Sequence, residues 1–177
     1  MPIEGGEGGA NTQTGMDFER ETQLRDMLNA VDGYGVDTAG KVFVEGEHVA
    51  DLCEKYSFYK QFLEPRGVNW KDHLSKRLLP DEALIVHGSK RVFIVEKKWQ
   101  QCAGSVDEKL QTCDFKKKQY QKVVNCTGYH VEYLYLFNDW FAKPEYRDVL
   151  GYIEDVGCRY FFGEVELGYF FPSQTLK

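Results

Sequence analysis

Asp81, Glu96 and Lys98 have the residue types and the spacing that chemistry on a phosphate group requires. Asp81 lies just before the apolar run "ALIV", and Glu96 and Lys98 follow the apolar run "VFIV". Two carboxylates close together repel each other and are costly to bury unless a cation lies between them. Mg²⁺ suits two such oxygen ligands, and a neighbouring lysine can stabilise charge that develops on a phosphate. The three residues would therefore suit metal-assisted hydrolysis of a phosphodiester.

A β-hairpin is the element that would bring these residues together. Gly88 and Ser89 have the composition of a two-residue hairpin loop between the two apolar runs. With that loop as the centre of the turn, Asp81 faces Glu96. Facing residues point to the same side of a sheet with Cβ atoms ~5 Å apart, and Lys98 lies ~7 Å further along that side.

The apolar residues of the two expected strands divide between both faces. Ile85, Val92 and Ile94 share the face of the acidic pair, and Phe93 and Val95 line the other face. A strand that is apolar on both faces is a central, buried strand. The alternative is a surface hairpin with an incidental acidic pair and a solvated lysine run, and the apolar flanks argue against it.

The rest of the chain supplies elements that would surround this hairpin. Apolar spacing predicts four helices, around residues 17–31, 54–63, 104–124 and 143–157. It also predicts a short strand and turn over 40–49, a strand over 130–138, and a strand with a hairpin over 158–171. This order indicates the α/β class, with an α+β mixed sheet flanked by helices. We expect a flexible Gly-rich segment over 1–15 and one domain over 16–177.

Composition excludes several classes of protein. The chain has 177 residues, 42% of them hydrophobic, and a net charge of −6, which disfavours a protein that coats nucleic acid non-specifically. Residues 90–122 nevertheless carry nine Lys/Arg and four acids, a local net charge of +5. The cysteine count is odd and no Cys-x-x-Cys pair occurs, so we expect reduced thiols in a cytoplasmic protein. No apolar run reaches the ~20 residues of a membrane span.

Two short motifs resemble those of the PD-(D/E)XK nuclease superfamily. Pro80-Asp81 resembles the PD element, and Glu96-Lys97-Lys98 resembles the (D/E)XK element, with 14 residues between Asp81 and Glu96. The stretches "GGANTQTGMDFE" and "GSVDEKLQT" look like segments of small type II restriction endonucleases of that superfamily. The resemblance covers most of residues 9–160. It implies a restriction-endonuclease-like fold, in which helices flank a central mixed β-sheet.

The resemblance also implies roles for individual residues. Asp81 and Glu96 would bind Mg²⁺ together with the backbone carbonyl of Lys97, and Lys98 would orient the attacking water. Many members of the superfamily add a carboxylate from the first helix, where Glu19 stands in "MDFERE". A helical wheel places Glu19 nearly opposite the apolar stripe and Glu21 on its flank, so either could face the site. Gln100 shares the face of Glu96 and could contact water or phosphate; the alternative is a polar residue at a strand end.

These observations lead to the hypothesis of a Mg²⁺-dependent, sequence-specific endonuclease of double-stranded DNA, of the type II restriction class. Each active site cuts one strand, so cutting both strands at a palindrome indicates a homodimer. The alternatives are a repair or junction-resolving nuclease of the same fold, and a non-catalytic DNA-binding module on that fold. Lys116, Lys117 and Lys118 are candidates for contacts with the DNA backbone, against the alternative of a solvated helix face. The four histidines show no metal-binding spacing, and His87 is expected to be a turn residue.

Overall fold

The computed structural model of the chain describes residues 15–18, 20–102 and 106–172. The Gly-rich segment before residue 15 and the side chain of Glu19 lie outside these ranges. Among the described residues, no helix combines the length and the apolar character that a membrane crossing requires.

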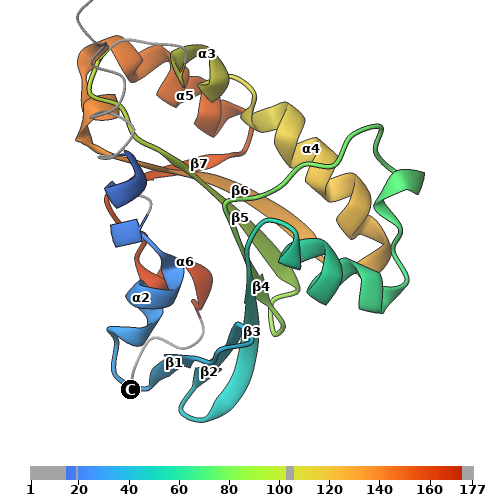
Figure 1. Cartoon of the computed structure of the whole chain (residues 1–177). Coiled ribbons are helices and arrows are strands. Elements are labelled where there is room, and N and C mark those ends of the chain that lie inside the picture. Colours follow the sequence, from blue (N-terminus) through green and yellow to red (C-terminus); the bar gives the residue numbers. More distant parts are fainter. Residues whose placement is uncertain (1–14, 19, 103–105, 173–177) are drawn as a thin grey trace, which may run out of the picture.

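Seven strands form one mixed sheet in which the spatial order follows the chain (Figure 1). The first five strands pair antiparallel, and β5–β6 and β6–β7 pair parallel. The strands are β1 (Tyr34–Val36), β2 (Lys41–Val44), β3 (Glu47–Cys53), β4 (Glu82–Val86), β5 (Arg91–Lys98), β6 (His130–Phe137) and β7 (Arg159–Phe162). The expected α+β mixed sheet with flanking helices is therefore confirmed.

Helices cover both faces of this sheet (Figure 1). One face packs against α2 (Leu24–Asn29) and α6 (Leu167–Phe170). The other face packs against α3 (Val106–Leu110), α4 (Cys113–Val124), α5 (Arg147–Asp155) and the π-helix η1 (Phe58–Leu63). Short 3-10 turns occupy Glu64–Arg66, Trp70–Asp72, Asn125–Thr127, Asp139–Ala142 and Pro144–Tyr146.

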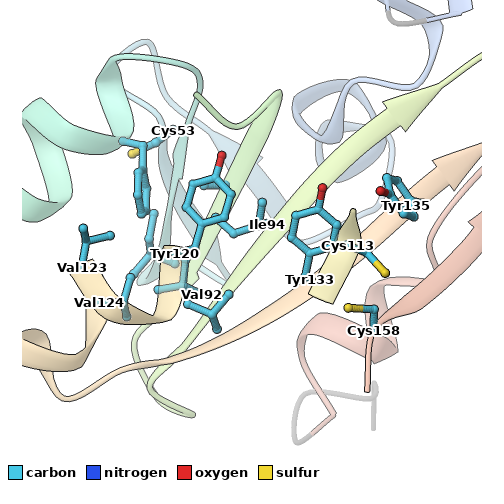
Figure 2. Close-up of a cluster of buried hydrophobic side chains, with 14 of the residues drawn as sticks. Cys53, Val92, Ile94, Cys113, Tyr120, Val123, Val124, Tyr133, Tyr135 and Cys158 are labelled. Atoms are coloured by element: carbon cyan, nitrogen blue, oxygen red, sulfur yellow. The ribbon is translucent and has the colours of Figure 1, made fainter. Parts of the chain in front are cut away.

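The parallel strands require crossover connections, which α4 and α5 provide. Helix α4 buries Cys113, Tyr120, Val123 and Val124 against the sheet, as Figure 2 shows. Pro144 lies in the turn just before α5, and Gly157 follows α5 with a left-handed φ of 73°, in agreement with the sequence prediction.

The β4–β5 pair is buried on both faces, as predicted. Ile85, Val92 and Ile94 belong to the core beneath α4, and Phe93 and Val95 belong to the core beneath α2. Each residue of β4 is buried, and only Arg91 at the start of β5 is exposed. The two strands of the hairpin therefore do not lie on the surface.

The structure corrects the predicted elements at the first helix, at the helix over 104–124 and after β7. The helix predicted over 17–31 breaks at Gln23, whose ψ of 128° is extended, because the N–H of Leu24 donates to the buried carboxylate of Glu82. The helix predicted over 104–124 divides into α3 and α4 around Thr112. The hairpin predicted after β7 is wrong, since the chain instead forms α6, where Phe170 packs against Phe93 at 5.0 Å between ring centroids.

Candidate active site

The β4–β5 register places the motif residues as the sequence predicts. Glu82 pairs with Val95 and Val86 pairs with Arg91, so continuation of the ladder beyond β4 brings Asp81 to Glu96. The turn itself differs, because the strands end at Val86 and resume at Arg91, which leaves four residues in the loop rather than two. The register is unaffected, since the centre of the turn is the same.

Glu96 lies near the end of β5, with its side chain buried between two lysines. Lys98 Nζ lies 2.9 Å from Glu96 Oε2, and Lys116 Nζ, from α4, lies 3.1 Å from Glu96 Oε1. Lys98 Nζ also donates to the backbone carbonyl oxygen of Lys97 at 3.1 Å. One ammonium therefore contacts both a carboxylate oxygen of Glu96 and the neighbouring carbonyl.

Asp81 is held at the start of β4 by backbone and side-chain contacts. Its Oδ2 accepts the N–H of Lys97 at 3.0 Å, and its Oδ1 is paired with Lys55 Nζ. Burial opposes ionisation of Asp81, but the ammonium groups of Lys55 and Lys98 and the Lys97 N–H together lower its pKa below the usual value. Asp81, Glu96 and Lys98 are thus brought into one electrostatic cluster.

The side chain of Lys97 points to the opposite face of the sheet. Its Nζ lies 2.8 Å from Glu82 Oε2, and both side chains are almost completely buried, at 4% and 2% exposed. Burial raises the pKa of Glu82, although Lys97 acts in the opposite direction. Lys97 therefore offers only its backbone N–H and C=O to the Asp81 and Glu96 side of the sheet.

Sequence reasoning missed the part that Lys55 plays, and it did not predict that Lys116 pairs with Glu96. Cys53 pairs with Ala83, so continuing the β3–β4 register puts Lys55 opposite Asp81. Pairing of β3 with β4 was the missing signal, because the prediction ended the earlier strand near residue 49. Lys116 was predicted to contact the DNA backbone, and that stays a prediction; the structure adds that its Nζ contacts Glu96 Oε1 from α4.

The other lysines of the triplet point elsewhere. Lys117 Nζ donates to the backbone oxygen of Gly157 at 2.6 Å, just past α5. Lys118 Nζ pairs with Asp114 at 2.7 Å, and its side chain is 70% exposed. The three lysines therefore do not present one common face, and of the three only Lys118 has a largely exposed side chain.

Three carboxylate and amide candidates remain, and they are Glu19, Glu21 and Gln100. Glu19 lies outside the described residues, and Glu21 is exposed. Gln100 is buried, and neither amide atom of its side chain has a hydrogen-bond partner in the described part of the chain. Its backbone N–H and C=O are bound by the side chain of Asn138.

Two buried tyrosines lie within the electrostatic influence of Glu96. Tyr120, from α4, and Tyr133, from β6, are buried side by side in the core that Figure 2 shows. Burial, with a smaller contribution from the charge of Glu96, raises the pKa of both hydroxyls. Both hydroxyls are therefore neutral at physiological pH. Glu96 is itself buried, and charges interact more strongly in such a poorly solvated environment.

His87 lies in the loop between β4 and β5, so the prediction of a turn residue is confirmed. His48 and His87 both contact Asp51, so the structure does assemble a cluster that spacing along the chain does not reveal.

Comparison with known proteins adds no assignment to this geometry. No protein-family model matches the chain, and no curated protein or solved structure matches it significantly.

Proposed function

We propose that the protein is a Mg²⁺-dependent endonuclease that hydrolyses phosphodiester bonds in duplex DNA, of the type II restriction class, on a restriction-endonuclease-like fold. The observation that carries the proposal is the gathering of Asp81, Glu96 and Lys98 where β4 begins and β5 ends. The hairpin that carries these two carboxylates and the lysine is rigid and buried. A purely structural role does not require such a set of charged groups to be buried.

The oxygen atoms of this set suit a hard divalent cation. Lys98 Nζ lies within 3.1 Å of both Glu96 Oε2 and the Lys97 carbonyl oxygen, so these two oxygens converge on one cationic group. Asp81 is tied to the same residue through the Lys97 N–H. Carboxylate and carbonyl oxygens with room for water are the ligands that Mg²⁺ prefers. Asp81, Glu96 and the Lys97 carbonyl would hold the ion.

The residues at this site would then have separate roles in the reaction. When bound, Mg²⁺ supplies positive charge that offsets the negative charge developing on the phosphate. Lys98 would turn its ammonium group toward the substrate, where it orients the attacking water and stabilises the charge that develops on the phosphate. Lys116 stays on Glu96 Oε1 and fixes the direction of that carboxylate. Lys55 balances the charge of Asp81 while the site is free of metal.

Double-stranded DNA is the expected substrate, and a homodimer is the expected form. One active site cuts one strand, so two copies related by a twofold axis would cut both strands of a palindromic sequence. Sedimentation of the free protein and of its DNA complex would test this part of the proposal.

One observation favours a second candidate, a non-catalytic DNA-binding module on the same fold. The carboxylates of Asp81 and Glu96 are already neutralised by the ammonium groups of Lys55, Lys98 and Lys116. Such ion pairs satisfy the buried charges without a metal.

Cleavage of plasmid and genomic DNA in Mg²⁺ decides between the candidates. Glu96→Gln removes a metal ligand and Lys98→Ala removes the positioning charge, and each should lower the cleavage rate by on the order of 10² or more. Lys118→Ala, at an exposed lysine of α4, is the matched control and should retain the rate constant for cutting at saturating enzyme. Gel-shift on the same duplex should show binding by all variants.

Discrete fragments from the wild type would support the restriction assignment, and structure-selective nicking would point to a repair or junction nuclease. If the folded Lys98→Ala protein cuts at the wild-type rate, Lys98 is not the catalytic lysine. If the wild type binds but never cuts in Mg²⁺, the binding module replaces the nuclease.

A further inference from the structure

A second group of metal-ligand side chains lies at the other end of β4. His48 Nε2 is 2.8 Å from Asp51 Oδ1, and His87 Nε2 is 3.2 Å from Asp51 Oδ2. The two imidazole rings meet edge to face, with centroids 5.0 Å apart. Asp81 and His87 are six residues apart along an extended chain, so this cluster lies about 20 Å from the candidate active site.

A β-bulge in β3 is what brings the cluster together. Residues three apart on a regular strand, such as His48 and Asp51, point to opposite faces of the sheet. Here β2 pairs Val42 with Ala50 but Phe43 with His48, so Val49 is an extra residue on β3. The bulge resets the alternation and turns His48 and Asp51 to the same face.

The register of β4 brings the third member to the same face. Asp51 pairs with Ile85, and His87 follows Ile85 by two residues, so its side chain returns to that side of the sheet. The N–H of His87 also donates to the Val49 carbonyl oxygen at 3.0 Å, which fixes the turn against the bulge. The cluster is therefore built into the pairing of β2, β3 and β4.

A hydrogen bond with Tyr129 sets the orientation of the His87 ring. Its Nδ1 lies 3.2 Å from the hydroxyl of Tyr129, which leaves Nε2 directed at Asp51. In metal-binding histidines, a hydrogen bond to the ring nitrogen that does not touch the metal fixes the ring orientation and the tautomer. Arg66 and Lys90 lie near, with their charges over the Tyr129 ring at 5.7 and 4.9 Å, and they weaken the attraction of the cluster for a cation.

The distances and the exposure suit a small ion. One ligand atom from each of the three residues can be chosen so that all lie within 4.8 Å of one another. Bonds of about 2.0–2.1 Å in a tetrahedral site separate ligand atoms by about 3.4 Å, so modest side-chain rotation closes the set. The three side chains are 27–35% exposed, which lets an ion enter and keep a water molecule as a fourth ligand.

We propose that His48, Asp51 and His87 form a binding site for a transition-metal ion of the Zn²⁺ type, with the fourth position open to water. Two imidazole nitrogens and one carboxylate favour Zn²⁺ over Mg²⁺, which prefers oxygen ligands. The ion would join β3 to the β4–β5 turn and stabilise that end of the hairpin. The site is independent of the proposed nuclease function, because it shares no residue with Asp81, Glu96 and Lys98.

Titration of the full chain with Zn²⁺, followed by calorimetry and thermal unfolding, tests the site. The wild type should bind one Zn²⁺, and this binding should be unchanged in Glu96→Gln. The unfolding temperature of the wild type should rise as Zn²⁺ is added. His48→Gln and His87→Gln should each weaken binding by more than about 100-fold, because loss of an outer partner alone costs 10- to 100-fold. Tyr129→Phe, which keeps the ring and removes only the hydroxyl, should fall in that smaller range.

His130→Gln is the matched control, because His130 is an exposed histidine outside the cluster. The Co²⁺-loaded protein should show the spectrum of nitrogen and oxygen ligands without thiolate charge transfer. Zn²⁺ binding that is unchanged in His48→Gln and His87→Gln, or a thiolate band in the Co²⁺ spectrum, would overturn the proposal. If either histidine variant does not fold, Tyr129→Phe and the Co²⁺ spectrum still decide.

Discussion

Lys116 Nζ lies 3.1 Å from Glu96 Oε1, so the crossover helix α4 is tied directly to the end of β5. This contact places Lys116 beside Glu96 in the candidate active site. Lys116→Met should lower the cleavage rate at saturating Mg²⁺ because Glu96 loses the group that fixes its direction. The measurement is single-turnover cutting of one duplex over a series of Mg²⁺ concentrations. Unchanged rates at every concentration would remove Lys116 from the site.

Lys118 should behave in the opposite way. Its side chain is largely exposed and pairs with Asp114 in its own helix, so it can reach a phosphate. Lys118→Met should reduce the slope of log affinity against log salt by about 1 and leave the single-turnover rate constant unchanged. Binding measured between about 50 and 200 mM salt gives the slope. A slope equal to that of the wild type would mean that this lysine is simply solvated.

The part of the site that could be predicted is the part that one hairpin determines. Glu96 and Lys98 share a strand, and the position of the turn fixes Asp81 opposite them. Lys55 and Lys116 could not be predicted in these roles because they reach the site through the β3–β4 pairing and through the packing of α4. Pairing between distant strands and the placement of a crossover helix are tertiary properties that local patterns do not contain.

Local signals also predict part of the fold, and tertiary contacts determine the rest. The apolar faces of β4 and β5, and the ends of α5, follow from alternation and from Pro144 and Gly157, which are local signals. The break before α2 is not local, because a buried carboxylate from β4 caps it. The bulge at Val49 is likewise invisible to a pattern of strict alternation, and it is what hides the relation between His48 and Asp51.

Asp81 should make the protein less stable in acid. Its pKa in the folded chain lies below the unfolded value of about 3.9, so the unfolded state binds more protons in between. The contribution of the carboxylate to the free energy of unfolding is present above about pH 4 and is lost as pH falls through the folded pKa. Asp81→Asn should therefore flatten the decrease in stability below about pH 4 in urea unfolding at several pH values. Asp148→Asn, at an exposed aspartate, is the control; equal slopes for both variants would contradict the assignment.

The buried pair of Glu82 and Lys97 separates stability from chemistry. Breaking a buried ion pair by removing one charge typically costs about 3–5 kcal/mol, because the remaining charge is buried without compensation. Glu82→Gln and Lys97→Met should each lower the free energy of unfolding by that order. The double variant should lose less than either single variant, because no charge is then left buried without its partner. Gln also keeps an oxygen for the Leu24 N–H, and Met replaces the buried stem of the lysine.

Denaturant unfolding of the four proteins gives the coupling energy directly. Cleavage should survive in the double variant, because only the backbone of Lys97 faces Asp81 and Glu96. This behaviour contrasts with the adjacent Lys98, whose side chain contacts Glu96. Strictly additive losses in stability would show that the two charges do not depend on each other. A folded double variant that binds DNA but does not cut would show that the Lys97 side chain contributes to the reaction.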